Sequence, residues 1–176
     1  VAVGPFYAQT PGKSSPTWDV YFSPRGGATY AIRQALDNAK SVVLVQAYSF
    51  TSAPIAEALV RAHKRGVKVQ VLLDKSQKTE KYSSADFLAN AGINVKIDAA
   101  HAIAHNKIMI IDGKTVITGS FNFTKAAEEK NAENLLLVHD KQLATQYTEN
   151  WQLHNAHSEP YSPRAERKEG SALPRR

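Results

Sequence analysis

The stretch HNKIMIIDGKTVITGSFN, residues 105–122, carries the strongest prediction about the fold of this chain. Residues 107–111 and 115–118 are apolar and rich in Ile, Val and Thr, and the pair Asp112-Gly113 stands between them. Two such runs around an Asp-Gly pair are typical of a β-hairpin, because the tight turn needs positive φ. The stretch therefore predicts two antiparallel strands joined by that turn.

Polar residues flank the predicted hairpin in the pattern H-x-K-x4-D-x6-G-S-x-N. Side chains two residues apart on a strand share a face, so His105 and Lys107 form one pair, and Ser120 and Asn122 form a second. The hairpin can bring the two pairs together. An imidazole, an ammonium, a hydroxyl and a carboxamide suit a tetrahedral phosphate, because they offer donors for its oxygens and a nitrogen that can attack phosphorus or move a proton.

This pattern resembles the HKD motif of the phospholipase D superfamily at every fixed position, and the similarity continues through residues 119–124 to Glu133. Within the superfamily, the chain resembles the small bacterial endonucleases of the Nuc type. Those proteins also have one motif, an AYSFT segment, and SFNFTKAAE followed by K-N-x-E-N, which are residues 47–51, 120–128 and 130–134 here. The resemblance extends from about residue 20 to about residue 155.

The resemblance implies a role for each polar residue of the motif. His105 is expected to be the nucleophile or the general acid, and Lys107 a catalytic, phosphate-binding cation. Ser120 and Asn122 are expected to contact the phosphate, although both residue types are also common in turns. Glu133 is expected to hydrogen-bond the imidazole of His105, which would fix its tautomer and stabilise the imidazolium.

Two further motif positions are expected to be structural. Asp112 lies five residues after Lys107, so strand alternation places it on the opposite face, in the turn. Gly119 is best explained by the close approach of neighbouring backbone.

The chain contains one motif and no internal repeat, whereas most of the superfamily carries two motifs in one chain and needs both. One histidine attacks phosphorus, and the other protonates the leaving oxygen and then activates water. The resemblance therefore implies a symmetric homodimer whose two motifs meet at the twofold axis. It implies no metal and no other cofactor, because lysines, asparagines and histidines already neutralise the developing charge.

The expected activity is that of a metal-independent phosphodiesterase, an endonuclease that cleaves DNA, or RNA, with little sequence specificity through a phosphohistidine intermediate. The alternative is hydrolysis of cardiolipin-like phospholipids, which would favour an apolar interfacial surface that the sequence does not show. A non-catalytic nucleic-acid binder would be expected to have a broken motif, and this motif is complete. Two basic groups could contact phosphates or be solvated surface: Arg61, His63, Lys64, Arg65 and Lys68, and then Lys75, Lys78 and Lys81.

Helical and extended patterns alternate along the chain, which predicts an α/β sandwich, a mixed sheet between helices, as in the phospholipase D-like fold. Helices are predicted over residues 26–40, 54–64, 83–91, 124–129 and 141–154. Beside the hairpin, strands are predicted over residues 3–9, 19–22, 41–48, 67–73, 94–97 and 135–138. Residues 1–157 are expected to form one domain, and residues 158–176 a polar, mobile tail.

Composition limits the remaining choices. The chain has 176 residues, 43% of them hydrophobic, which is enough for one domain with a core. Its net charge of +6 favours a polyanionic partner, and the absence of cysteine excludes disulfides and cysteine-ligated zinc. No apolar run is long enough to predict a membrane span. The chain begins with Val1, as a processed exported protein or a shortened chain would, and a periplasmic or secreted location is expected because relatives often carry signal peptides.

A rival interpretation is a metal site at His101 and His105. Histidines four residues apart bind metal when they lie on a helix. The region has no helical period, and the sequence indicates no acidic third ligand nearby, so no metal site is predicted.

Overall fold

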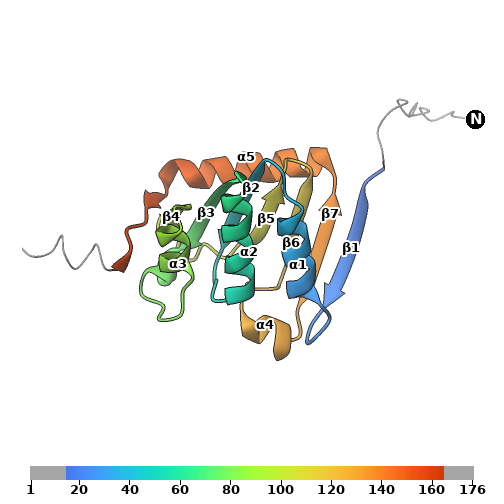
Figure 1. Ribbon diagram of the computed structural model, residues 1–176, viewed down its shortest axis with the longest axis horizontal. Helices are drawn as coiled ribbons and strands as arrows, with labels where there is room; N and C mark the ends of the chain where they lie inside the picture. Colours follow the sequence, from blue (N-terminus) through green and yellow to red (C-terminus); the bar gives the residue numbers. More distant parts are fainter. Residues whose placement is uncertain (1–14, 165–176) are drawn as a thin grey trace, which may run out of the picture.

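The protein is described here by a computed structural model in which residues 15–164 are placed. They form one eight-stranded mixed sheet in the order β1-β7-β6-β5-β2-β3-β4-β8, with helices on both of its faces (Figure 1). The strands are β1 Thr17–Phe22, β2 Val42–Ala47, β3 Lys68–Asp74, β4 Asn94–Asp98, β5 Lys107–Ile111, β6 Thr115–Gly119, β7 Asn134–His139 and β8 Glu159–Pro160. The helices are α1 Ala28–Asp37, α2 Ala53–Lys64, the 3-10 turn η1 Lys75–Lys78, α3 Ala85–Asn90, α4 Lys125–Glu129 and α5 Lys141–His157. This architecture confirms the predicted fold class.

The sheet is parallel only where helices cross over. Strands β2, β3 and β4 run parallel to one another, and every other neighbouring pair is antiparallel. Helices α2 and α3 make the connections between the parallel strands, as such crossovers require. They lie with α1 on one face, and α5 runs along the other (Figure 1).

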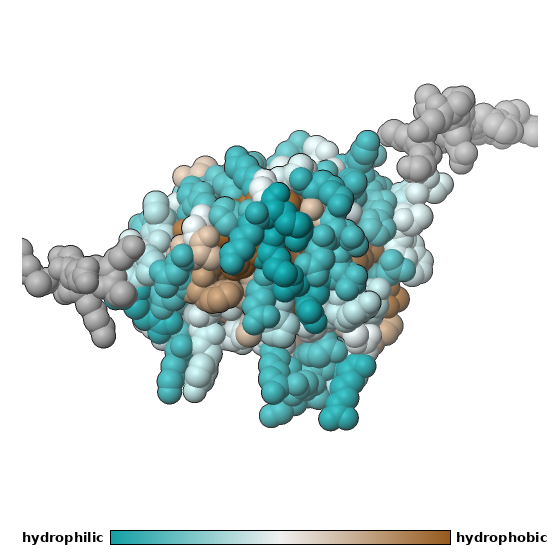
Figure 2. All heavy atoms as spheres, in the orientation of Figure 1, coloured by the Kyte–Doolittle hydropathy of each residue, from teal (hydrophilic) through white to brown (hydrophobic). Residues whose placement is uncertain are grey.

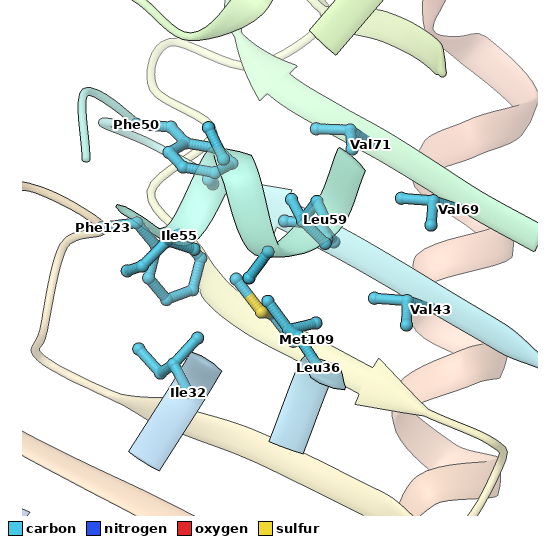
Figure 3. Close-up of a cluster of buried hydrophobic side chains, with 14 of the residues drawn as sticks. Ile32, Leu36, Val43, Phe50, Ile55, Leu59, Val69, Val71, Met109 and Phe123 are labelled. Carbon is cyan, nitrogen blue, oxygen red and sulfur yellow. The ribbon is translucent and has the colours of Figure 1, made fainter. Parts of the chain in front are cut away.

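Strand alternation divides the core between the two faces. Met109 of β5 faces α1 and α2, where it lies among Leu36, Leu59 and Val43 (Figure 3). Its neighbour Ile108 points the other way, toward α5. Burial on both faces therefore explains why residues 108–111 of β5 are all apolar.

The predicted hairpin is formed by β5 and β6. Ile111 pairs with Thr115, and the turn residues Asp112 and Gly113 have φ angles of 54° and 61°. Positive φ at both positions is the geometry of a type I′ turn, which an Asp-Gly pair favours.

The folded part extends beyond the predicted boundary at residue 157. Residues 159–160 form β8 and pair with β4, Tyr161 is buried, and Arg164 forms an ion pair with Asp86. Sequence patterns missed this segment because a two-residue strand containing proline has no strand signal of its own. The predicted strand at residues 3–9 and the predicted tail from residue 165 lie outside the described residues. Within residues 15–164, no helix combines the length and apolarity needed to span a membrane.

Candidate active site

The motif residues gather at one edge of the sheet because four strands begin or end there. β2 ends at Ala47, which pairs with Lys107 at the start of β5. β6 ends at Gly119, which pairs with Leu135 near the start of β7. His105, Ser120 and Glu133 lie within two residues of these strand ends. The hairpin and its neighbours thus place residues up to 28 positions apart at the lower edge of the sheet in Figure 1, near α4.

His105 presents an exposed imidazole beside an aromatic ring. Its ring centroid lies 4.6 Å from that of Tyr48, with an interplanar angle of 57°. The N–H of Tyr48 donates to the carbonyl of Asn106 at 2.8 Å, which continues the β2–β5 pairing to the residue beside His105. Backbone hydrogen bonding therefore fixes the chain beside His105, and its imidazole remains accessible to a substrate.

Lys107 carries its ammonium into the protein, and its side chain is only 7% exposed. Nζ donates to the carbonyl oxygen of His105 at 2.9 Å and lies 5.3 Å from the ring centroid of Tyr48. Burial lowers the pKa of Lys107, and the negative charge of Glu133 opposes that shift. A buried cation with one carbonyl and one ring face as neighbours is a site that an anion would complete.

Ser120 and Glu133 form a hydrogen-bonded pair. Ser120 Oγ donates to Glu133 Oε2 at 2.6 Å and accepts from the N–H of Asn134 at 3.1 Å. The second oxygen of Glu133 accepts from Asn131 Nδ2 at 3.0 Å. In residues 15–164, the hydrogen bonds of this carboxylate go to Ser120 and Asn131 and not to His105, so the expected contact with the imidazole is absent within one chain. The structure instead makes Glu133 the group that orients the Ser120 hydroxyl.

Asn122 lies between two buried aromatic residues, Phe121 and Phe123. The carbonyl of Phe123 accepts from the N–H groups of Thr51 and Ser52 at 3.0 and 2.9 Å, which fixes this segment against the start of α2. Within residues 15–164, the side-chain Oδ1 of Asn122 is buried without a hydrogen-bond partner. Such an orphaned amide group is uncommon, and a bound ligand could satisfy it.

The two structural positions of the motif have clear physical roles. Gly119 has φ +143°, and a Cβ built there would lie 2.3 Å from the carbonyl oxygen of Asn134, so a side chain does not fit. The carboxylate of Asp112 accepts hydrogen bonds from the N–H groups of Lys40, Ser41 and Val42. Burial raises the pKa of Asp112, but these backbone bonds outweigh it and hold that pKa below its ordinary value. Asp112 thereby ties the turn to the segment between α1 and β2, at the edge of the sheet opposite His105.

The two basic groups predicted from sequence lie at opposite edges of the sheet. Residues 61–68 lead into β3, which begins at Lys68, and lie away from the active-site edge; Arg61 there is paired with Asp37 at 3.0 Å. Lys75, Lys78 and Lys81 follow the end of β3 and lie at the same edge as the motif. Only this second group is placed to meet a substrate bound at His105.

A second polar cluster, which sequence analysis missed, joins Asp98, His101, His154 and His157. The prediction that no acidic ligand lies near His101 was wrong. Asp98 lies three residues before His101, and its carboxylate contacts the imidazole of His101 at 3.0 Å. His101 does not join His105 in this cluster. The available signal was two short patterns, D-x2-H at 98–101 and H-x2-H at 154–157, and only the fold shows that they meet.

Comparisons with known proteins agree with this geometry. Residues 32–153 match the protein-family profile described as "Cardiolipin synthase, PLD-like domain". Among solved structures, the chain is similar to Nuc from Salmonella typhimurium, described as a phospholipase D family member, with 41% identity and a TM-score of 0.81 over 84% of this chain and 99% of Nuc. It is also similar to NucT from Helicobacter pylori, with 26% identity and a TM-score of 0.78 over 84% of this chain and 100% of NucT.

Curated relatives carry two kinds of name. A protein named phospholipase D from Rickettsia felis is 48% identical over 130 residues, which are 74% of this chain and 65% of that relative. A protein named mitochondrial cardiolipin hydrolase from Xenopus tropicalis is 31% identical over 125 residues, 69% of this chain and 60% of that relative. The chain thus spans slightly less than two thirds of the length of these curated relatives.

Proposed function

This chain belongs to the phospholipase D superfamily, whose enzymes hydrolyse phosphodiesters, and from that premise we propose that it is a metal-independent endonuclease acting on DNA, with RNA as a further substrate. The observation that carries the proposal is the meeting of an exposed His105 and a buried Lys107 at one sheet edge, with Ser120 and Asn122 at the same edge. Phosphodiester chemistry needs this combination of a nucleophile and fixed cationic or hydrogen-bonding groups.

The reaction follows from the placement of these groups. A ring nitrogen of His105 attacks phosphorus, a P–N bond forms, and the P–O bond to the leaving oxygen breaks. The leaving oxygen takes a proton from a second imidazole, which then removes a proton from water as that water displaces the histidine and restores it. Lys107 stabilises the charge that develops on the phosphoryl oxygens.

The second imidazole is the reason to propose a homodimer. The chain carries one motif, so His105 of the partner subunit would supply the acid and base across a twofold axis. Two large apolar side chains near this edge fit such an interface: Phe22, which pairs with Asn134, is 64% exposed, and Ile103, two residues before His105, is 56% exposed. Burial of these side chains against a second copy would remove apolar surface from water.

Nucleic acid is favoured over lipid by the surface around the site. Lys75, Lys78 and Lys81 lie at the edge that carries His105, and their positive charge favours a polyanion there. Lys75 Nζ also donates to the carbonyl of His101, and Lys78 lies 3.8 Å from Glu159. The face of the molecule in Figure 2 is mostly hydrophilic, with hydrophobic side chains in smaller areas. The similarity to Nuc and NucT over nearly their whole lengths also supports a nuclease.

Hydrolysis of a phospholipid is the second candidate. It is supported by relatives named phospholipase D and mitochondrial cardiolipin hydrolase. The chemistry at phosphorus would be the same, so the active-site residues do not separate the two candidates.

The test is cleavage of single-stranded DNA, double-stranded DNA, RNA and cardiolipin vesicles by the purified protein in excess EDTA. The matched variants are His105→Ala and His139→Ala, because His139 is an exposed histidine at the other end of β7. We expect nucleic-acid cleavage that persists in EDTA, is retained in His139→Ala and is lost in His105→Ala. A short reaction with 32P-labelled DNA, stopped with base, should leave label on the wild-type chain and none on His105→Ala.

Three outcomes would contradict the proposal. Cleavage lost in EDTA and restored by a metal would refute metal-independent catalysis. Full activity of His105→Ala would refute the histidine nucleophile. Turnover of cardiolipin without turnover of any nucleic acid would replace the nuclease with the lipid hydrolase.

A further inference from the structure

The cluster of Asp98, His101, His154 and His157 is built by the fold at a place separate from the phosphate-binding residues. Asp98 is the last residue of β4, and His101 lies in the loop that follows. His154 and His157 lie one turn apart at the end of α5. Strand β8 follows α5 at once and pairs with β4, so the end of this helix is held beside Asp98.

The four side chains converge on a small volume. Nδ1 of His154 lies 2.7 Å from one oxygen of Asp98, and Nδ1 of His101 and Nε2 of His157 lie 3.0 and 3.3 Å from the other. The three imidazole centroids are 4.9, 5.3 and 5.4 Å apart. One nitrogen or oxygen from each residue lies within 4.8 Å of all the others.

These separations are close to those of a metal site. In a tetrahedral zinc site with bonds of 2.0–2.1 Å, neighbouring ligand atoms lie about 3.3 Å apart. The distances from the two oxygens of Asp98 to the three imidazoles are 2.7–3.3 Å, and one ligand atom from each residue lies within 4.8 Å of the others. Side-chain rotations that draw the imidazole nitrogens together would bring one oxygen and three nitrogens to the corners of a tetrahedron.

The ligand types of the cluster also suit a cation. Asp98 offers a fully buried carboxylate, and the imidazoles of His154, His101 and His157 lie around it. A carboxylate oxygen and imidazole nitrogens are ligands that zinc accepts. A bound ion would take the three nitrogens that now point at Asp98, and each neutral imidazole would keep its proton on its other ring nitrogen.

We propose that Asp98, His101, His154 and His157 bind one divalent transition-metal ion of the zinc type in a closed, structural site. Imidazole nitrogens with one carboxylate oxygen are ligands that zinc accepts, and four protein ligands leave no open position for catalysis. The ion would tie the loop after β4 to the end of α5. That loop leads directly to His105, so the site would stabilise the segment that carries the proposed nucleophile.

Hydrogen bonds at both ends of the loop hold its backbone in place. At the far end of the loop, the N–H of Ala104 donates to buried Asp74 at 2.8 Å. At the near end, the N–H of Ala100 donates to Asp98 at 3.2 Å, and Lys75 Nζ donates to the carbonyl of His101 at 3.0 Å. The backbone around the histidines is therefore held in place before any metal binds, which lowers the entropic cost of binding.

The experiment measures zinc binding directly and does not depend on the nuclease activity. The protein is purified without a polyhistidine tag, stripped with EDTA, dialysed and titrated with ZnCl2, with bound metal counted by mass spectrometry and Tm measured with and without zinc. Ligand variants are His157→Gln, His154→Gln and Asp98→Asn. The control is the double variant His63→Gln/His139→Gln, which removes two histidines elsewhere.

We expect one zinc ion per chain and a higher Tm with zinc in the wild type and in the control. Each ligand variant should bind zinc about tenfold more weakly or worse, because even outer partners of metal ligands have effects of that size. Cobalt in place of zinc should give the intense visible absorption of a tetrahedral ion. His157→Gln is the variant of first choice, because its partly exposed side chain can be replaced with the least effect on folding.

Two results would overturn the proposal. One is a wild-type protein that folds but binds no zinc or cobalt, which would leave the cluster as a hydrogen-bonded group around Asp98. The other is unchanged zinc affinity in His157→Gln and His154→Gln with circular dichroism identical to that of the wild type. Catalysis that persists in EDTA would agree with both proposals, since the metal is assigned to stability and not to the reaction.

Discussion

Lys107 shows how a functional residue differs from the residues that only stabilise the fold. It occupies a strand position whose neighbours on the same face, Met109 and Ile111, are apolar core residues. An apolar side chain would be expected there on stability grounds alone. A lysine at that position costs folding free energy because its charge is removed from water, and no carboxylate in the described part of the chain forms an ion pair with it. This loss of folding free energy is explained if the ammonium of Lys107 binds a phosphate group of the substrate.

The first prediction concerns this cost. Replacing Lys107 with Met should raise the free energy of unfolding by about 1 kcal/mol near neutral pH, because a poorly compensated buried charge is removed. Burial lowers the pKa of Lys107 from 10.5, so the penalty is present below the lowered pKa and shrinks as the pH rises through it toward 10.5. Urea unfolding of both proteins at several pH values checks this. A variant less stable than the wild type at every pH would contradict it.

Anion binding gives a second prediction for the same residue. Inorganic phosphate should raise the Tm of the wild type, because a ligand that binds only the folded state stabilises it. The effect should be lost in Lys107→Met. Lys114→Met is the matched control, because Lys114 is an exposed lysine in the hairpin turn at the opposite edge of the sheet. Equal stabilisation of both variants by phosphate would show that the anion binds elsewhere.

Asp112 is a residue whose importance should be structural. Asp112→Asn should lower the free energy of unfolding by about 1–3 kcal/mol, because a carboxylate that accepts several backbone bonds is replaced by an amide with one acceptor. The lowered pKa of Asp112 means that its contribution is complete above the ordinary value of 3.8 and is lost as the pH falls through the lowered value. The stability difference between wild type and variant should therefore disappear in acid. Variant chains that remain folded should cleave at the wild-type rate.

At the scale of elements, local signals explain which parts of the fold the sequence predicts. The hairpin was predicted because its strands and its Asp-Gly turn are adjacent in sequence, and β5 has the predicted bounds, Lys107–Ile111. β8 was not predicted because residues 159–160 are extended only through pairing with β4, 62 or more positions earlier. The histidine cluster and the hydrogen bond between Glu133 and Ser120 were not predicted for the same reason, because their residues are far apart in sequence. Contacts between distant parts of the chain form β8, the histidine cluster and the Glu133–Ser120 pair, and local sequence patterns do not predict such contacts.

Helix α5 depends on few residues for its attachment to the sheet. Ala144 and Trp151 are its buried residues, and the indole Nε1 of Trp151 donates to the carbonyl of Val45 at 2.9 Å. Most of the other residues of the helix are polar or partly exposed. Trp151 is therefore the main buried contact between α5 and β2, whereas the end of the helix is also held by the contact of His154 with Asp98.

Trp151→Phe should lower the free energy of unfolding by about 1–3 kcal/mol, because it leaves a cavity and removes the hydrogen bond to Val45. Leu153→Ala is the control on the same helix, since Leu153 is exposed, and its effect should stay within about 0.5 kcal/mol. Urea denaturation followed by circular dichroism compares the two. Equal effects would mean that Trp151 is not the residue that fastens α5.

At the scale of the whole molecule, one chain offers half of the proposed catalytic machinery. The motif residues lie at a sheet edge with His105 exposed, and the carboxylate of Glu133 is engaged by Ser120 and Asn131. The motif predicted which residues gather there, and the fold shows the edge at which they lie. A second copy meeting this edge would bring another imidazole to the phosphate, since a twofold interface presents the same surface from both chains.

Mixing wild-type and His105→Ala chains tests whether both histidines are needed. If each active site requires His105 from two chains, an equal mixture that exchanges freely contains wild-type dimers as about one quarter of all dimers. Activity should then be about half of that given by the same amount of wild-type protein alone, and it should fall in proportion to the wild-type fraction as more variant is added to a fixed amount of wild type. In the control, wild type is mixed with His139→Ala, which keeps His105, and the activity should be proportional to the total concentration of chains. Activity that stays constant on adding His105→Ala would mean that a single chain holds a complete site, and the shared-site dimer would have to be abandoned.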